Sequence, residues 1–152
     1  MTAIVVAGAA FLFAVLWFDL MFDAQVLKHP AGTLPPDVLA ATSSYYRRVT
    51  VEGAPMMYLP VVVMLLTLGA IVCELVRHSV PAWVAWASLG LGGWAVVSVA
   101  LIAVPRAQRI GRAQEPPETL SDLARLVLRL HALAAACWLV VIALQICGGG
   151  LR

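Results

Sequence analysis

The sequence predicts an all-α integral membrane protein folded as a four-helix bundle. The chain has 152 residues, of which 62% are hydrophobic and only 12% charged, whereas soluble domains carry about 25% charged residues. Four apolar segments each have about 20 residues or more, enough to cross a hydrocarbon core of about 30 Å. Only helices and closed barrels satisfy their backbone in lipid, and no succession of short alternating strands is present. One domain, 1–152, is expected, with helices over 3–23, 55–77, 82–104 and 123–147.

The first helix is predicted to be retained, because residues 3–23 lack both a basic leader and a small-residue cleavage site. It ends in WFDLMFD, which places Asp19 and Asp23 on one helical face. A carboxylate in the hydrocarbon region costs several kcal/mol unless it is paired or hydrated. We therefore expect Asp19 to face the bundle interior and to contact a partner on another helix. Asp23, nearer the boundary, is expected to meet cytoplasmic arginines.

The first loop contains a predicted short helix. Pro35-Pro36-Asp37 suits a helix start, because proline fits the first turn and an acidic group favours the positive helix end. The segment VLAATSSYYRRV follows and runs toward Gly53. Its adjacent tyrosines and arginines are typical of a helix lying at the membrane interface.

The third predicted helix carries a stripe of small residues. Ala85, Ser88, Gly92 and Ala95 recur at helical spacing on one face. Lipid supplies no hydrophobic drive between helices, so close backbone approach is important for packing. The stripe is expected to lie against a neighbouring helix.

Prolines divide the third loop from the flanking helices. Pro105 is expected to end the third helix, and Pro116-Pro117 to interrupt any continuation. Thr119 to Asp122 resembles a capping box before the fourth helix, which the glycines at 148–150 are expected to end.

The fourth helix supplies the expected partners of Asp19. Counted from the predicted boundaries, Asp19 and His131 reach similar depth, and Arg129 lies on the other side of the helix. An Asp19–His131 or Asp19–Arg129 contact is open to two interpretations. It is a structural clamp, or it is a site that passes a proton, orients a quinone-like ligand or binds a metal. The candidate catalytic residues are Asp19 and His131, and the candidate ligand-binding residues are Asp19, Asp23, Tyr58, Arg129, His131 and Trp138.

No cofactor or metal site is assigned. His29 and His78 lie outside the predicted core on opposite membrane sides, which disfavours a haem held by two histidines. Glu74 and His78, at i and i+4, fit an ion-paired helix end better than a metal site. Cys73 and Cys147 share a predicted membrane side, so a bridge between them is open, but no CxxC motif is present.

Basic residues predict the orientation. Eight of the ten lysines and arginines lie in the first and third loops or at the start of the fourth helix. Because basic loops remain in the cytoplasm, these loops are expected inside and both termini outside, in a bacterial inner membrane. 

The plan of the chain resembles the small tetraspan membrane proteins of the anthrone-oxygenase-like kind. The likeness rests on the length, the four helices, the segment VPRAQRIG after the third helix and the segment ARLVLRLHALAAACW. It covers the full chain and implies a four-helix bundle.

Two functions follow as hypotheses. The first is a non-enzymatic membrane subunit or binding protein for partners, lipid or a hydrophobic ligand. The alternative is a membrane-embedded oxidoreductase acting on an apolar aromatic or quinone-like substrate. The expected partners are the lipid bilayer and other membrane subunits or further copies of the chain. A net charge of +2 and the absence of a basic run give no signature of nucleic-acid binding.

Overall fold

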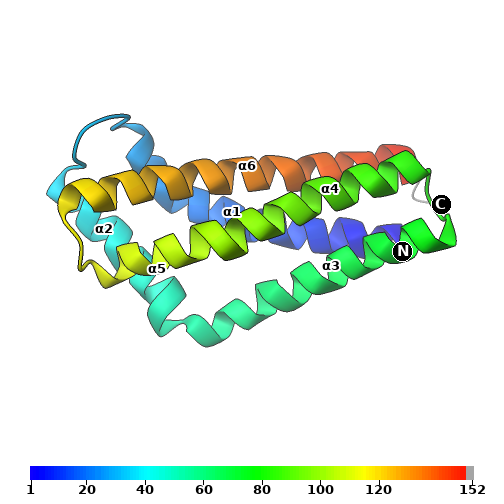
Figure 1. Cartoon of the computed structure of the whole chain (residues 1–152), viewed down its shortest axis with the longest axis horizontal. Coiled ribbons are helices and arrows are strands. Elements are labelled where there is room, and N and C mark those ends of the chain that lie inside the picture. The colour runs from blue at the N-terminus through cyan, green and yellow to red at the C-terminus, as the bar shows by residue number, and fades with distance from the viewer. Residues whose placement is uncertain (150–152) are drawn as a thin grey trace.

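The computed structural model describes residues 1–149, and this part of the chain is helical without strands. Four helices are long and apolar enough to cross a membrane, so the chain is an integral membrane protein. They lie side by side as a four-helix bundle (Figure 1), which confirms the predicted fold class. The spanning helices cover Thr2–Leu27, Ala54–Arg77, Ala82–Arg112 and Pro117–Gly148.

Two of these spans, the second and the third, are composed of more than one element. The α-helices are α1 Thr2–Leu27, α2 Pro36–Tyr46, α3 Tyr58–Arg77, α4 Ala82–Ser98, α5 Val104–Arg112 and α6 Pro117–Gly149. The π-helical turns are η1 Arg47–Glu52 and η3 Val99–Ala103, and η2 Ala54–Met57 is a 3₁₀ turn. The glycines at 148–150 were expected to end the fourth helix, and this end lies outside the described residues.

The small-residue stripe of α4 packs inside the bundle, as predicted. Its four members are buried, and a Cβ on Gly92 would lie only 3.2 Å from ring atoms of Trp138 on α6. Trp94 and Val97, elsewhere around α4, are 44% and 54% exposed. The absence of a side chain at Gly92 therefore makes room for the largest side chain in the core.

The prediction that Pro105 ends the third helix is wrong. The span continues through η3 into α5 and ends at Arg112. Proline lacks an N–H and its ring crowds the carbonyl four residues earlier. The wider π turn just before it relieves this conflict, since the Val104 N–H bonds to the Val99 carbonyl, five residues back.

The fourth helix begins six residues earlier than expected, at Pro117 rather than at 123. Proline is favoured in the first helical turn, so Pro116-Pro117 start α6 instead of interrupting it. The predicted capping box is therefore inside the helix. Ser121 Oγ donates to the Pro117 carbonyl at 2.6 Å and accepts the Leu34 N–H at 2.9 Å, which ties the first loop to α6.

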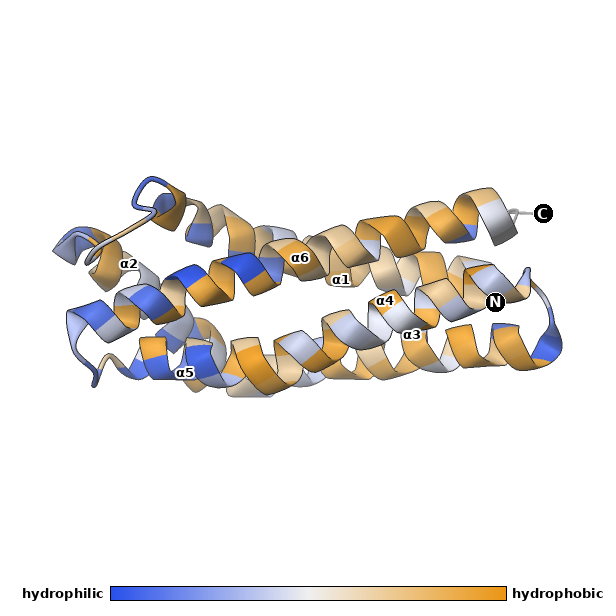
Figure 2. Ribbon diagram, turned by 45° about the horizontal axis from the view of Figure 1, so that its top comes forward, coloured by the Kyte–Doolittle hydropathy of each residue, from blue (hydrophilic) through white to orange (hydrophobic). Residues whose placement is uncertain are grey.

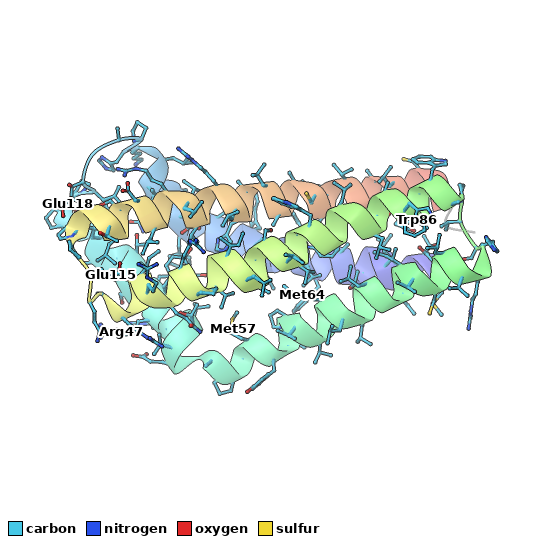
Figure 3. The ribbon with its side chains drawn as sticks, viewed as in Figure 1. Arg47, Met57, Met64, Trp86, Glu115 and Glu118 are labelled. Atoms are coloured by element: carbon cyan, nitrogen blue, oxygen red, sulfur yellow. The ribbon has the colours of Figure 1, made fainter. Side chains whose placement is uncertain are left out.

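The predicted helix of the first loop is present as α2, and it packs into the bundle end through buried Val38, Thr42, Ser43 and Tyr46. Arg47, labelled in Figure 3, donates from Nε to the Gly111 carbonyl on α5 at 3.1 Å. A Cβ on Gly111 would lie 2.7 Å from the Arg47 backbone nitrogen. Glycine is required for this close approach, which positions Tyr46.

Hydrophilic residues gather at the bundle end formed by α2, α5 and the start of α6, whereas the middle of the bundle is largely hydrophobic (Figure 2). The N-terminus and the end of α6 lie at the opposite end (Figure 1). Large apolar side chains such as Trp17, Phe18 and Leu65 are more than half exposed around the bundle. Such a surface suits contact with lipid.

Candidate functional site

The α3 helix diverges from the other helices toward its N-terminal end (Figure 1). All of its buried residues lie from the middle of the helix onward, at Thr67, Ala70, Ile71 and Glu74. The N-terminal half therefore leaves space beside α1, α6 and the α4–α5 helix.

A cavity of about 80 Å³ occupies this space. Its walls are mostly apolar, and Met57 and Met64 lie between α3 and the α4–α5 helix (Figure 3). Both π turns contribute, η1 through Val49 and Thr50 and η3 through Val99. The full lining is Leu12, Val15, Leu16, Asp19, Tyr46, Val49, Thr50, Met57, Pro60, Met64, Ala95, Val99, Val104, Ala107, His131 and Trp138.

A buried network from three elements lies at the polar end of the cavity. Asp23 on α1 accepts a hydrogen bond from the Tyr46 hydroxyl of α2 at 2.7 Å. Its other carboxyl oxygen lies 3.0 Å from Nδ1 of His131 on α6. The three residues are between 1% and 4% exposed. Both carboxylate oxygens of Asp23, the Tyr46 hydroxyl and Nδ1 of His131 thus have protein partners, as buried polar groups require.

Asp19 finds a different partner from the one expected. It accepts the Tyr45 hydroxyl at 2.6 Å, while His131 pairs with Asp23, and Arg129 takes no part. The expectation that Asp23 meets arginines is also wrong. The reason is depth: α1 continues about one turn beyond the predicted end at residue 23, and α6 starts earlier than predicted. Asp23, rather than Asp19, is therefore level with His131.

The two tyrosines act as hydrogen-bond donors. Burial, reinforced by the neighbouring Asp19 carboxylate, raises the pKa of Tyr45 above its ordinary value. Burial and the Asp23 carboxylate raise the pKa of Tyr46 well above its ordinary value as well. Both phenols hence keep their protons at neutral pH. Their hydrogen bonds offset part of the free energy lost when two carboxylates leave water for the bundle.

His131 is held in a defined orientation by Asp23. The carboxylate accepts from Nδ1, which places the hydrogen on that nitrogen when the imidazole is neutral. Within residues 1–149 the Nε2 atom makes no hydrogen bond, and the side chain lines the cavity. Nε2 is then an acceptor for a ligand hydroxyl, and a donor to a ligand carbonyl when the ring is protonated. This arrangement of an imidazole oriented by a carboxylate also suits acid–base chemistry.

Of the other predicted site residues, one lines the cavity and two do not. Trp138 lines the cavity and is 1% exposed. Tyr58 is 74% exposed and lies away from the cavity, because Met57, Pro60 and Met64 occupy the inner face at helical spacing. Arg129 is exposed on the outer surface of α6.

Sequence reasoning missed Tyr45, Tyr46 and Thr50 as site residues. The signal was present in the adjacent tyrosines of SSYYRRV. By themselves they indicate a helix at the membrane interface, because the packing of α2 against the bundle end cannot be inferred from a local pattern.

A second buried polar cluster lies toward the opposite end of the bundle. Glu74 accepts the Thr2 hydroxyl at 2.9 Å and the Gln145 amide at 3.0 Å, and the same amide lies 3.2 Å from Ser88 Oγ. Glu74 and Gln145 are fully buried. The expected Glu74–His78 pair at the helix end is therefore wrong, because the Glu74 carboxylate points inward to α6.

The cysteines and possible metal ligands form no further site in the described part of the chain. Cys73, Cys137 and Cys147 are all free. No group of three or more histidine, cysteine or acidic side chains within residues 1–149 lies close enough together to hold a metal ion.

Comparisons with known proteins do not assign a family. No family model matches the chain, and no curated protein and no solved structure matches it. The geometry of the cavity and its polar network therefore carries the functional argument.

Proposed function

We propose that this membrane protein binds a small apolar molecule with a polar head, such as a quinone or a phenol, in the cavity beside His131. The observation that carries the proposal is an apolar cavity with Asp19 and His131 at one end. Binding sites for small molecules typically combine apolar walls with a few placed polar groups.

The size of the cavity limits what it encloses. An apolar cavity of about 150 Å³ accommodates benzene, so the cavity of about 80 Å³ holds a ring only after flexible lining side chains such as Met57 and Met64 move. The remainder of the ligand would extend past Met57 and Met64 toward lipid, where α3 diverges. Methionine side chains adapt readily to a ligand, which suits them to this position.

A cavity-filling variant tests the proposal. Val99 lines the cavity, so Val99→Phe should reduce the affinity for decylubiquinone measured by equilibrium dialysis in mild detergent. Val97→Phe is the matched control, because Val97 is 54% exposed and lies outside the cavity. Equal binding by the wild type and Val99→Phe, with both variants folded, would refute binding in this cavity. No detectable binding of decylubiquinone or of the phenol 2,6-dimethylphenol by the wild type would refute the proposed ligand class.

One observation favours the oxidoreductase alternative. The Asp23–His131 pair adjoins the cavity, so Nε2 is placed to accept one of the two protons that a quinol releases when an external acceptor takes its two electrons, and the second proton passes to water. His131→Gln should then keep quinol binding and abolish turnover with a soluble electron acceptor. A wild type that binds decylubiquinol without turning it over would refute the enzyme and leave the binding protein.

For the orientation, we propose that the end formed by α2, α5 and the start of α6 faces the cytoplasm in a bacterial inner membrane. The basic residues of the first and third loops support this choice. In a cysteine-free background, a cysteine at exposed Ala113 should be protected from an impermeant maleimide in intact cells, and one at exposed Ser79 should be labelled. The reverse labelling pattern would overturn this orientation.

A further inference from the structure

A groove of about 410 Å³ lies on the outer surface between α1 and α6, near the hydrophilic end of the bundle. Its floor includes Leu20 and Leu27 from α1 and Leu128 and Ala132 from α6. Arg125 and Arg129 line the same groove. The groove thus combines an apolar surface with two guanidinium groups, and it is separate from the cavity beside His131.

The two arginines have different surroundings. Arg125 donates to the His29 carbonyl at 3.0 Å, to the Gly32 carbonyl and to Asp122 at 3.2 Å. Its side chain is only 12% exposed, so it holds the first loop against α6. Arg129 is exposed, and within residues 1–149 it makes no side-chain hydrogen bond or ion pair.

The position of Arg129 along α6 directs its side chain toward the hydrophilic end. It lies four residues after Arg125, about 6 Å deeper along the helix axis. The Cα–Cβ bonds of a helix tilt toward its N-terminus, and the N-terminus of α6 lies at the hydrophilic end (Figure 2). The apolar part of the Arg129 side chain therefore lies along the helix surface, and its guanidinium group reaches toward the level of the lipid head groups.

We propose that this groove binds an anionic phospholipid of the surrounding leaflet, with its phosphate on Arg129 and an acyl chain along the α1–α6 floor. The charge of Arg129 has no counterpart in the described protein, and burial of an unpaired charge at the margin of the hydrocarbon is unfavourable. A guanidinium binds phosphate through two parallel hydrogen bonds, and basic pockets between spanning helices recognise anionic head groups. The leucines provide the complementary surface for the chain.

Lipid binding to the delipidated full chain in a neutral detergent tests the proposal. Native mass spectrometry should show one phosphatidylglycerol bound in preference to a phosphatidylcholine with the same acyl chains. Arg129→Gln should weaken phosphatidylglycerol binding about tenfold, the loss expected for one charge-assisted contact. Arg112→Gln is the matched control, because it removes the same charge from the exposed end of α5, outside the groove.

Two further measurements keep the result decisive. Soluble glycerol phosphate should not compete, since it lacks the acyl chain, and successful competition would overturn the lipid in favour of a free phosphate. Ala132→Trp fills the exposed floor without altering a charge and should also weaken phosphatidylglycerol binding, which covers the case in which Arg129→Gln fails to fold. Equal losses in Arg129→Gln and Arg112→Gln, or no loss in Ala132→Trp, would overturn the proposed site.

Discussion

Replacing Tyr46 by phenylalanine tests whether the buried network holds the polar end of the bundle together. The hydroxyl of Tyr46 donates to Asp23 at 2.7 Å, and both residues are 1% exposed. Tyr46→Phe removes this donor while leaving the ring in place. Asp23 then keeps only the bond to His131, and water has little access to replace the lost partner.

The expected loss of stability is about 2 kcal/mol. A hydrogen bond to a charged group contributes about 1.5–3 kcal/mol. Interhelical hydrogen bonds in membranes average only about 0.6 kcal/mol, because the unfolded chain in lipid also finds partners. The complete burial of both partners and the carboxylate acceptor favour a value in the upper range.

The neighbouring tyrosine gives a matched control. Tyr45 also donates to a carboxylate, that of Asp19, but both of these side chains are only partly buried. Water can therefore replace the hydroxyl, and Tyr45→Phe should cost about 1 kcal/mol or less.

Unfolding in mixed micelles, followed by circular dichroism against the fraction of dodecyl sulfate, measures both variants. A larger loss for Tyr46→Phe than for Tyr45→Phe is expected. A loss for Tyr46→Phe equal to or smaller than that for Tyr45→Phe would show that burial does not determine the strength of this network. A double-mutant cycle with Asp23→Asn should give a coupling energy of about 1 kcal/mol or more.

Three further changes test the packing, the second polar cluster and the response to pH. Gly111→Ala should destabilise the protein by about 1–3 kcal/mol, because the added Cβ meets backbone, whereas Gly93→Ala, with open space, should be neutral or stabilising in the same unfolding assay. Gln145→Met should cost about 1–3 kcal/mol by removing the amide donor from buried Glu74, and the same change at exposed Gln114 should have no measurable effect on unfolding. The pKa of Tyr46 is raised on folding, so the contribution of its protonated hydroxyl to the free energy of unfolding is complete below about pH 10 and is lost as the pH rises toward the higher folded pKa. The loss of stability at alkaline pH should therefore be smaller in Tyr46→Phe than in the wild type. Equal dependence of stability on pH in the two proteins would contradict this.

The sequence by itself determined the membrane environment and the class of fold. Long apolar segments form helices in lipid, because a helix satisfies the backbone N–H and C=O groups of a segment within that segment. The stripe of Ser88, Gly92 and Ala95 likewise identified a packing face, since small residues permit close helix contact. A partner for Asp19 was also predictable, because an isolated carboxylate in the hydrocarbon region is costly.

Tertiary structure decided which groups meet. The pairing of Asp23 with His131, and of Asp19 with Tyr45, depends on helix ends that differ by a turn or more from the predicted ones. Pro117 starts α6 earlier than expected, and Pro105 is accommodated inside the third span, which therefore also ends later than expected. The cavity arises from the divergence of α3 and from two π turns, and these features follow from contacts between distant segments that a local pattern of apolar residues does not encode.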